Sequence, residues 1–178
     1  MKIRALNPSA GPELPCLFSS GPESADALIA AMSQADYLAA DWEYPTGKEE
    51  LMLLADVLGP RLLVAEPWQA VFPKAGVLIE SSISGGDLRT RFSDAAAAYP
   101  DRCWLLTQRL CAAFPLPCPD GQGKKAEPPA EEGFFAESLG CRYVHKPGQV
   151  ILFDTDETLK QKCRWAVDAG FLGWLSEE

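Results

Sequence analysis

The stretch that decides the fold is Asp36-Tyr37-Leu38-Ala39-Ala40-Asp41-Trp42-Glu43-Tyr44-Pro45. It begins with small and apolar residues that suit a buried strand, and it ends in two carboxylates on either side of a tryptophan. Because side chains alternate between the faces of a strand, Asp41 and Glu43 are expected on one face and Trp42 on the other. Pro45 ends the strand, so the sequence predicts both carboxylates at its carboxyl end, where (β/α) barrels carry their active sites.

This pair of carboxylates is suited to acid catalysis. Two carboxylates side by side can split their pKa values, so that one stays ionised while the other holds a proton near neutral pH. The alternative interpretation of the same residues is an ordinary strand that ends in solvated acids.

Apolar runs and amphipathic stretches alternate along the rest of the chain. Strands that alternate with helices of ten to fifteen residues indicate parallel βαβ units. The sequence therefore predicts one α/β domain over residues 1–178, with a reduced or incomplete (β/α) TIM-type barrel and a loop rich in proline and glycine at 116–129. The strands are expected at 3–6, 14–20, near Leu38, and at 61–66, 76–81, 103–107 and 171–175, with a hairpin of 142–144 and 149–153; the helices are expected at 23–34, 47–58, 85–98 and 155–169.

Composition limits the classes of ligand. The chain has 178 residues, 47% of them hydrophobic, which fits one globular domain with a real core. A formal charge of −9 argues against nucleic acid and anionic membranes as partners, because their phosphates would be repelled. Neutral polar ligands such as sugars are not penalised. The chain has no apolar run long enough to span a membrane and no apolar signal region at its start, so we expect a cytoplasmic protein, or a secreted one if a leader was removed.

The cysteines and the single histidine predict neither a metal site nor a cofactor. No two cysteines form a C-x-x-C pair, and His145 lies in a turn, so a zinc site would need thiolates at irregular spacings. We expect reduced thiols, several of them buried. The six are Cys16, Cys103, Cys111, Cys118, Cys141 and Cys163.

The opening stretch resembles the signature of the chitinase family, glycoside hydrolase family 18. That signature reads Asp-Gly-hydrophobic-Asp-hydrophobic-Asp-Trp/Phe-Glu, often followed by Tyr-Pro. Asp36 matches its first aspartate, Asp41 its third and Glu43 its catalytic glutamate. Ala39 stands where the second aspartate belongs, and Tyr37 replaces the glycine.

Two further segments extend the resemblance in the right order. The residues 17–21, Leu-Phe-Ser-Ser-Gly, are similar to the third-strand motif of the family, although Pro22 replaces its second glycine. The residues 147–174 resemble the late segment of the family, in which a strand leads to a helix carrying lysine, then a glycine-rich turn and a last strand. On this alignment the chain covers strands three to eight, and too few residues remain before Leu14 for two strands with their helices. The resemblance thus implies a pared-down barrel, or an open one whose exposed edges pair with a second copy in a homodimer.

The resemblance also implies roles for particular residues. Glu43 would protonate the glycosidic oxygen, while the 2-acetamido group of the substrate attacks the anomeric carbon and Asp41 orients that group. Substrate contacts would come from Asp36, Tyr44 and Trp174, the last as the floor of the sugar site; Trp174 could equally be a core residue.

Other residues differ from the family or stand outside its motifs. The sixth strand of the family usually ends Met-x-Tyr-Asp, whereas this chain reads Ile79-Glu80-Ser81-Ser82. A serine is too short to replace that tyrosine, and Glu80 is the residue that could substitute. Glu66, at the end of the strand 61–66, could reach the same mouth. We therefore expect a chitinase-like glycoside hydrolase or glycan-binding relative acting on N-acetylglucosamine-containing glycans. The alternatives are a catalytically inactive barrel used as a scaffold or binding protein, and an unrelated barrel enzyme.

Overall fold

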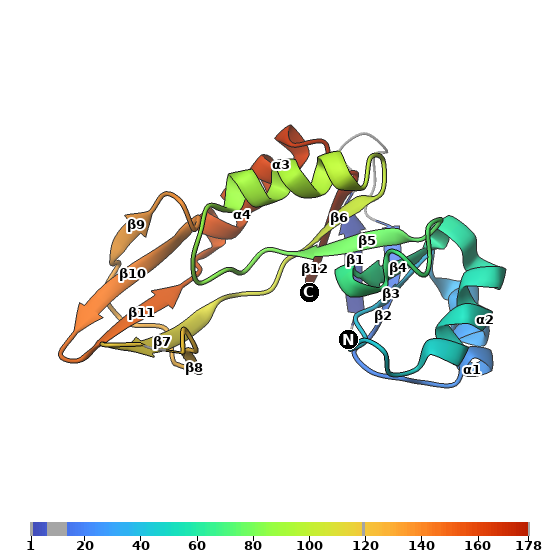
Figure 1. Cartoon of the computed structure of the whole chain (residues 1–178), viewed down its shortest axis with the longest axis horizontal. Coiled ribbons are helices and arrows are strands. Elements are labelled where there is room, and N and C mark those ends of the chain that lie inside the picture. Colours follow the sequence, from blue (N-terminus) through green and yellow to red (C-terminus); the bar gives the residue numbers. More distant parts are fainter. Residues whose placement is uncertain (1, 7–13, 119, 178) are drawn as a thin grey trace.

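The computed structural model describes residues 2–6, 14–118 and 120–177. It is a mixed α/β structure with two sheets (Figure 1). A curled sheet of mostly parallel strands lies toward one end of the molecule and an antiparallel sheet at the other. Helices α3 (Leu88–Ala98) and α4 (Asp156–Asp168) lie side by side along the region that joins the two sheets.

The curled sheet closes into a barrel. Six of its strands run parallel, and β1 (Lys2–Leu6) lies antiparallel between the first and the last of them. Of the two alternatives, the open barrel with exposed edges is therefore corrected, because β1 pairs on both sides and leaves this sheet no edge. The parallel strands are β2 (Leu14–Ser19), β3 (Tyr37–Ala40), β4 (Leu62–Ala65), β5 (Gly76–Glu80), β6 (Cys103–Leu106) and β12 (Gly173–Glu177).

Alternating side chains along these strands make two kinds of core. The inner set, which includes Leu63, Leu78 and Trp104, fills the barrel with residues from the strands alone. Trp104 fits because Gly76 lies beside it: a Cβ at that position would come within 2.5 Å of Leu63 Cδ2 and 3.1 Å of Trp104 Cδ1. Side chains thus fill the barrel interior, and in barrels of this kind the site lies at the carboxyl mouth.

Helices cover the outer face of the barrel. The pair α1 (Ala25–Ala31) and α2 (Lys48–Leu58) packs on one side, and Leu51, Leu54 and Leu58 of α2 are buried there at helical spacing. Helices α3 and α4 cover the opposite side. No α-helix follows β4, only the short turn η3 (Glu66–Trp68); η1 (Met32–Gln34) and η2 (Gly59–Arg61) extend α1 and α2.

The second sheet contains far more than the expected hairpin. Strands β10 (Cys141–Lys146) and β11 (Gln149–Phe153) form that hairpin, and three further strands extend it. Of these, β7 (Cys111–Pro115) was not predicted, because its Cys-Ala-Ala-Phe-Pro sequence has no alternating pattern, and β9 (Phe134–Ala136) is too short for one. Strand β8 (Lys124–Lys125) lies within the predicted loop 116–129 and pairs with β7.

A buried ion pair joins the second sheet to α4. Asp154, just after β11, is 2.8 Å from Lys162 Nζ, and both side chains are fully buried. The carboxylate also accepts hydrogen bonds from the Leu110 amide and the Thr158 hydroxyl, each at 2.9 Å. At the N-terminus of α4, Thr155 and Thr158 form a capping box. Both oxygens of the Asp154 carboxylate therefore have hydrogen-bond partners, as a buried charge requires.

In the part of the chain that the structure describes, we find no helix with both the length and the hydropathy needed to cross a membrane.

Candidate functional site

The Asp41–Glu43 segment leaves β3 at the carboxyl end of the barrel, as predicted from its pattern. Trp42 turns to the outer face and is buried there, where its indole donates to the Ser19 hydroxyl at 2.8 Å. Its carbonyl oxygen accepts a hydrogen bond of 2.8 Å from Trp68. Because Trp42 is fixed outward and Ala39 faces the interior, alternation directs Asp41 over the mouth of the barrel.

Asp41 is half-buried, and its amide donates to the Ser19 carbonyl at 3.0 Å. Burial raises the pKa of its carboxyl group above the ordinary value. Glu43, by contrast, is exposed, and its carbonyl accepts a hydrogen bond from Thr46 in the turn that follows. The two carboxylates predicted to act together therefore have different surroundings.

Glu80 is the second acid of the mouth. It ends β5, two residues beyond the interior residue Leu78, so it projects from the inner face of the sheet. Its pKa is raised by burial first, then by the charges of Asp41 and Glu66, while Arg91 lowers it. The Asp41 charge thus adds to the raised pKa of Glu80, whereas the pKa of Asp41 is raised by burial alone.

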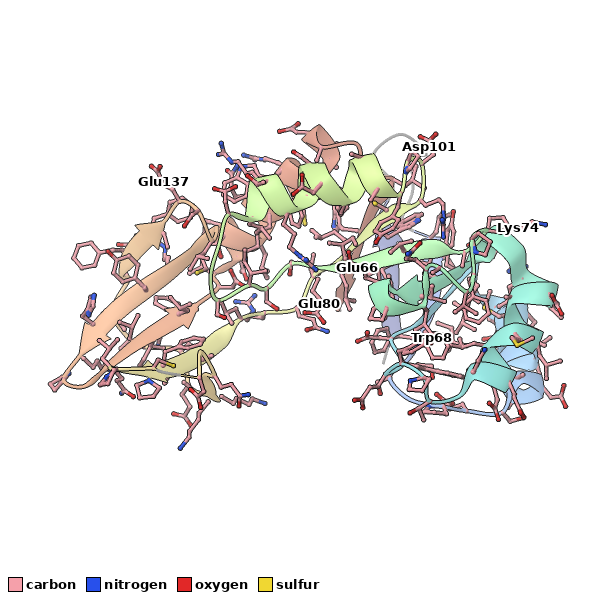
Figure 2. The ribbon with its side chains drawn as sticks, viewed as in Figure 1. Glu66, Trp68, Lys74, Glu80, Asp101 and Glu137 are labelled. Carbon is pink, nitrogen blue, oxygen red and sulfur yellow. The ribbon has the colours of Figure 1, made fainter. Side chains whose placement is uncertain are left out.

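Glu66 lies beside this pair but points toward α3. Figure 2 shows Glu66 and Glu80 close together at β5. The Glu66 carboxylate is 3.1 Å from Arg91 Nη2, and its charge contributes, after burial, to a raised pKa of Tyr99. It lines a pocket of about 560 Å³ between the residues 83–87 and one side of α3. Glu66 therefore influences the mouth through its charge, from a position on the outer side of the barrel.

Tyr44 lies at the rim beyond Glu43. Its ring is about half exposed and stands edge-on against Trp68, with 4.8 Å between the ring centroids. An aromatic ring held in this way by a buried tryptophan is available for contact with a ligand. Trp68 itself is fully buried and cannot make that contact.

Two predicted substrate contacts lie away from the mouth and need correction. Asp36 precedes β3 and is fixed at its amino end, where its amide donates to Pro15 and its carbonyl accepts from Arg61, both at 2.8 Å. Trp174 packs with the outer cluster around α3 and α4, while the next residue, Leu175, faces the interior. Alternation along β12 therefore excludes Trp174 as the floor of a site in this mouth.

The residue that the sequence analysis missed is Arg91. It lies on α3, and its guanidinium group is the cation that acts on both Glu66 and Glu80. The sequence did contain a signal for Arg91. In a βα unit the first turns of the helix lie near the carboxyl end of the preceding strand, and Arg91 is in the first turns of α3, four residues after the cap residue Asp87. Nothing in the local pattern distinguished it from Arg89, whose guanidinium lies over the Trp165 ring instead.

The described residues contain no group of three or more metal-ligating side chains, and no pair of cysteines is bonded. Four thiols are buried, and burial raises their pKa values, to about 12 for Cys16 and about 11 for the others: Cys103, Cys141 and Cys163.

No protein-family model, no curated protein and no solved structure matches this chain. What can be said of its function therefore depends on the geometry of the mouth and on the motifs that surround it.

Proposed function

We propose that this chain is a carbohydrate-active protein of the chitinase-like type, with its site at the carboxyl mouth of a reduced TIM-type barrel. The observation that carries the proposal is the pair Asp41 and Glu80 at the ends of β3 and β5, whose pKa values are both raised, that of Glu80 in part by the charge of Asp41. A carboxylic acid that keeps its proton toward neutral pH, next to a second carboxylate, is what acid-catalysed glycoside cleavage requires.

The positions of the motifs support the same proposal. The Leu-Phe-Ser-Ser-Gly segment ends β2, the acidic segment ends β3, and the late segment supplies β11, α4 and β12. The first two motifs end neighbouring parallel strands of the barrel. In the proposed alignment, β1 stands in place of the first two strands of the family.

The chemistry would follow the substrate-assisted route. The protonated acid donates its proton to the glycosidic oxygen, and the bond from that oxygen to the anomeric carbon breaks. The carbonyl oxygen of the 2-acetamido group forms the new bond to the anomeric carbon, while Asp41 accepts a hydrogen bond from the acetamido N–H. Water then attacks the anomeric carbon, the bond from that carbon to the acetamido oxygen breaks, and the water gives a proton to the carboxylate, which restores both the acid and the acetamido group.

Two residues are candidates for that acid. The resemblance assigns the role to Glu43, which lies exposed at the rim. Glu80 is also exposed, but it ends β5 on the inner face of the sheet, and its pKa is raised by burial and by the Asp41 charge, which favours it over Glu43. General acid catalysis contributes roughly 10²–10⁴-fold, so loss of the true acid would remove nearly all turnover.

Two observations favour the alternative, a non-catalytic glycan-binding relative or scaffold. Trp174 faces outward, so the mouth lacks that aromatic platform. Ala39 is fully buried in the barrel core, where the second aspartate of the family would stand. In either case we propose a neutral glycan as ligand, because the charge of −9 disfavours nucleic acid and anionic membrane. The compartment proposed is the cytoplasm, or the outside of the cell if a leader is removed.

Hydrolysis of fluorogenic chitobiose and chitotriose tests these proposals. The wild type is compared with Glu80→Gln, Glu43→Gln and Asp41→Asn, and with Glu137→Gln as the matched control, since Glu137 lies on the distant antiparallel sheet (Figure 2). Turnover that is lost in one glutamine variant and kept in the control identifies the acid.

If no variant and no wild type turns over, titration calorimetry with chitotriose decides between the two remaining cases. Binding that Asp41→Asn weakens supports the non-catalytic relative. No binding at all would refute the chitinase-like assignment.

A further inference from the structure

Strand β9 is an unusual edge of the antiparallel sheet. Among the described residues it pairs only with β10, so one side of its backbone has no partner strand. Its two phenylalanines are the clearest exposed aromatics of the sheet: Phe134 is 68% and Phe135 is 44% exposed. An open edge that carries exposed apolar side chains is a template for another strand.

The opposite edge of the same sheet is protected. Strand β8 is only Lys124–Lys125, both exposed. Lysines on a short edge strand oppose pairing, because a second strand would have to pack its side chains beside the two charged ammonium groups. Of the two edges, β9 is therefore the one open to addition (Figure 1).

We infer that β9 pairs antiparallel with β9 of a second copy of this chain, across a two-fold axis at Phe135. With Phe135 opposite its own counterpart, Phe134 lies opposite the partner's Ala136, so a large side chain meets a small one on that face. The Phe134 ring already packs on Tyr143, with 5.7 Å between centroids, and would cover the partner's Ala136. On the other face the two Phe135 rings would form a cross-strand aromatic pair.

The charges around β9 fit this register. Glu132 is 3.1 Å from Arg142 Nη2, and Glu131 is 4.0 Å from Lys146 Nζ, so the acids that precede the strand are paired within the chain. Glu137 follows the strand, and Figure 2 shows it at the outer side of the sheet.

In the proposed register, Glu137 faces the partner's Gly133. Gly133 has no side chain, and within each copy its carbonyl accepts a hydrogen bond from Arg142 at 3.3 Å. Glu137 would thus be a second carboxylate near the partner's Arg142, which already pairs with Glu132 of its own chain, at both ends of the paired strands.

Sedimentation velocity over a concentration series tests the inference. The wild type is expected to dimerise reversibly, and Phe135→Lys is expected to raise the dimer dissociation constant by about a hundredfold, from the apolar burial that is lost on both copies. The control is Leu53→Lys, which changes an apolar residue on α2 that is 58% exposed and should leave the constant unchanged.

Glu137→Lys tests the register. It brings a lysine to the partner's Arg142 and is expected to weaken the dimer, whereas a general relief of net negative charge would strengthen it. A wild type that stays monomeric at every concentration overturns the inference and leaves the edge to a different occupant. It is equally overturned if Phe135→Lys dimerises as well as the wild type, or if Glu137→Lys tightens the dimer. None of these readouts depends on glycosidase activity.

Discussion

The buried pair Asp154–Lys162 gives the sharpest test of how the two sheets are held together. Both side chains are fully buried, and the carboxylate lies 2.8 Å from the ammonium group. Removing one partner leaves the other as an uncompensated buried charge, which costs about 3–5 kcal/mol of unfolding free energy. For a chain of this size, that is a fall in Tm of roughly 6–20 °C.

The structure also predicts which side of the pair matters more. In Lys162→Met the carboxylate keeps two donors, the Leu110 amide and the Thr158 hydroxyl. In Asp154→Asn the ammonium group loses the only charge within its reach in the described residues. We therefore expect Lys162→Met near the lower end of the 3–5 kcal/mol range, about 3 kcal/mol, and Asp154→Asn near its upper end, about 5 kcal/mol.

The assay is urea unfolding followed by circular dichroism, together with thermal melts of the same variants. Arg109→Gln is the control, because it breaks the exposed ion pair with Asp156 next to the same helix and should change little. The double variant Asp154→Asn/Lys162→Met is expected to lose less than the sum of the single losses, since it leaves no buried charge. A loss of unfolding free energy below about 1 kcal/mol in both single variants would refute the reasoning. Removing one partner of a buried ion pair leaves the other charge buried and unpaired, which costs more than that.

Three further predictions follow from packing, charge and burial. Gly76→Ala is expected to cost about 1–3 kcal/mol in urea unfolding, because the new methyl group meets Leu63 at 2.5 Å, while Gly85→Ala, with nothing within 4 Å, should be near neutral. The raised pKa of Glu80 means that the folded chain holds that proton to higher pH than the unfolded chain, so stability falls as pH rises past the ordinary glutamate pKa. The unfolding free energy of Glu80→Gln should therefore equal that of the wild type at acid pH and exceed it at neutral pH. A variant that is less stable than the wild type at neutral pH would contradict this. In native protein, iodoacetamide followed by mass spectrometry should label Cys118 well before the four buried thiols, and equal labelling would show that those thiols are accessible.

Much of the fold could be read from local patterns. The apolar runs at Leu38, Leu63 and Leu78 predicted three of the parallel strands, and the spacing of Leu51, Leu54 and Leu58 predicted α2. These patterns are reliable because each strand or helix must bury its own apolar side chains. The strands that carry no such pattern were missed, β7 and β9 among them, since their pairing depends on neighbours that are distant in sequence.

The candidate site was predictable only in part. Asp41 could be placed because its face follows from alternation along the strand, and because Pro45 marks where that strand must end. The partner role of Glu80 could not be fixed from the sequence, because it depends on the approach of β3 and β5 and on the charge of Arg91 from α3. Trp174 shows the opposite case: its residue type suggested a sugar platform, but its register in β12 turns it outward.

The sequence by itself determined an α/β chain whose acidic segment lies at the carboxyl end of a parallel strand, because strand, helix and turn preferences act over a few residues. Only the tertiary structure decided that β1 closes the barrel, that the charge of Asp41 acts on Glu80, and that Glu66 pairs with Arg91. These are contacts between segments far apart in the chain, and their free energy depends on distance and burial, which no local pattern contains.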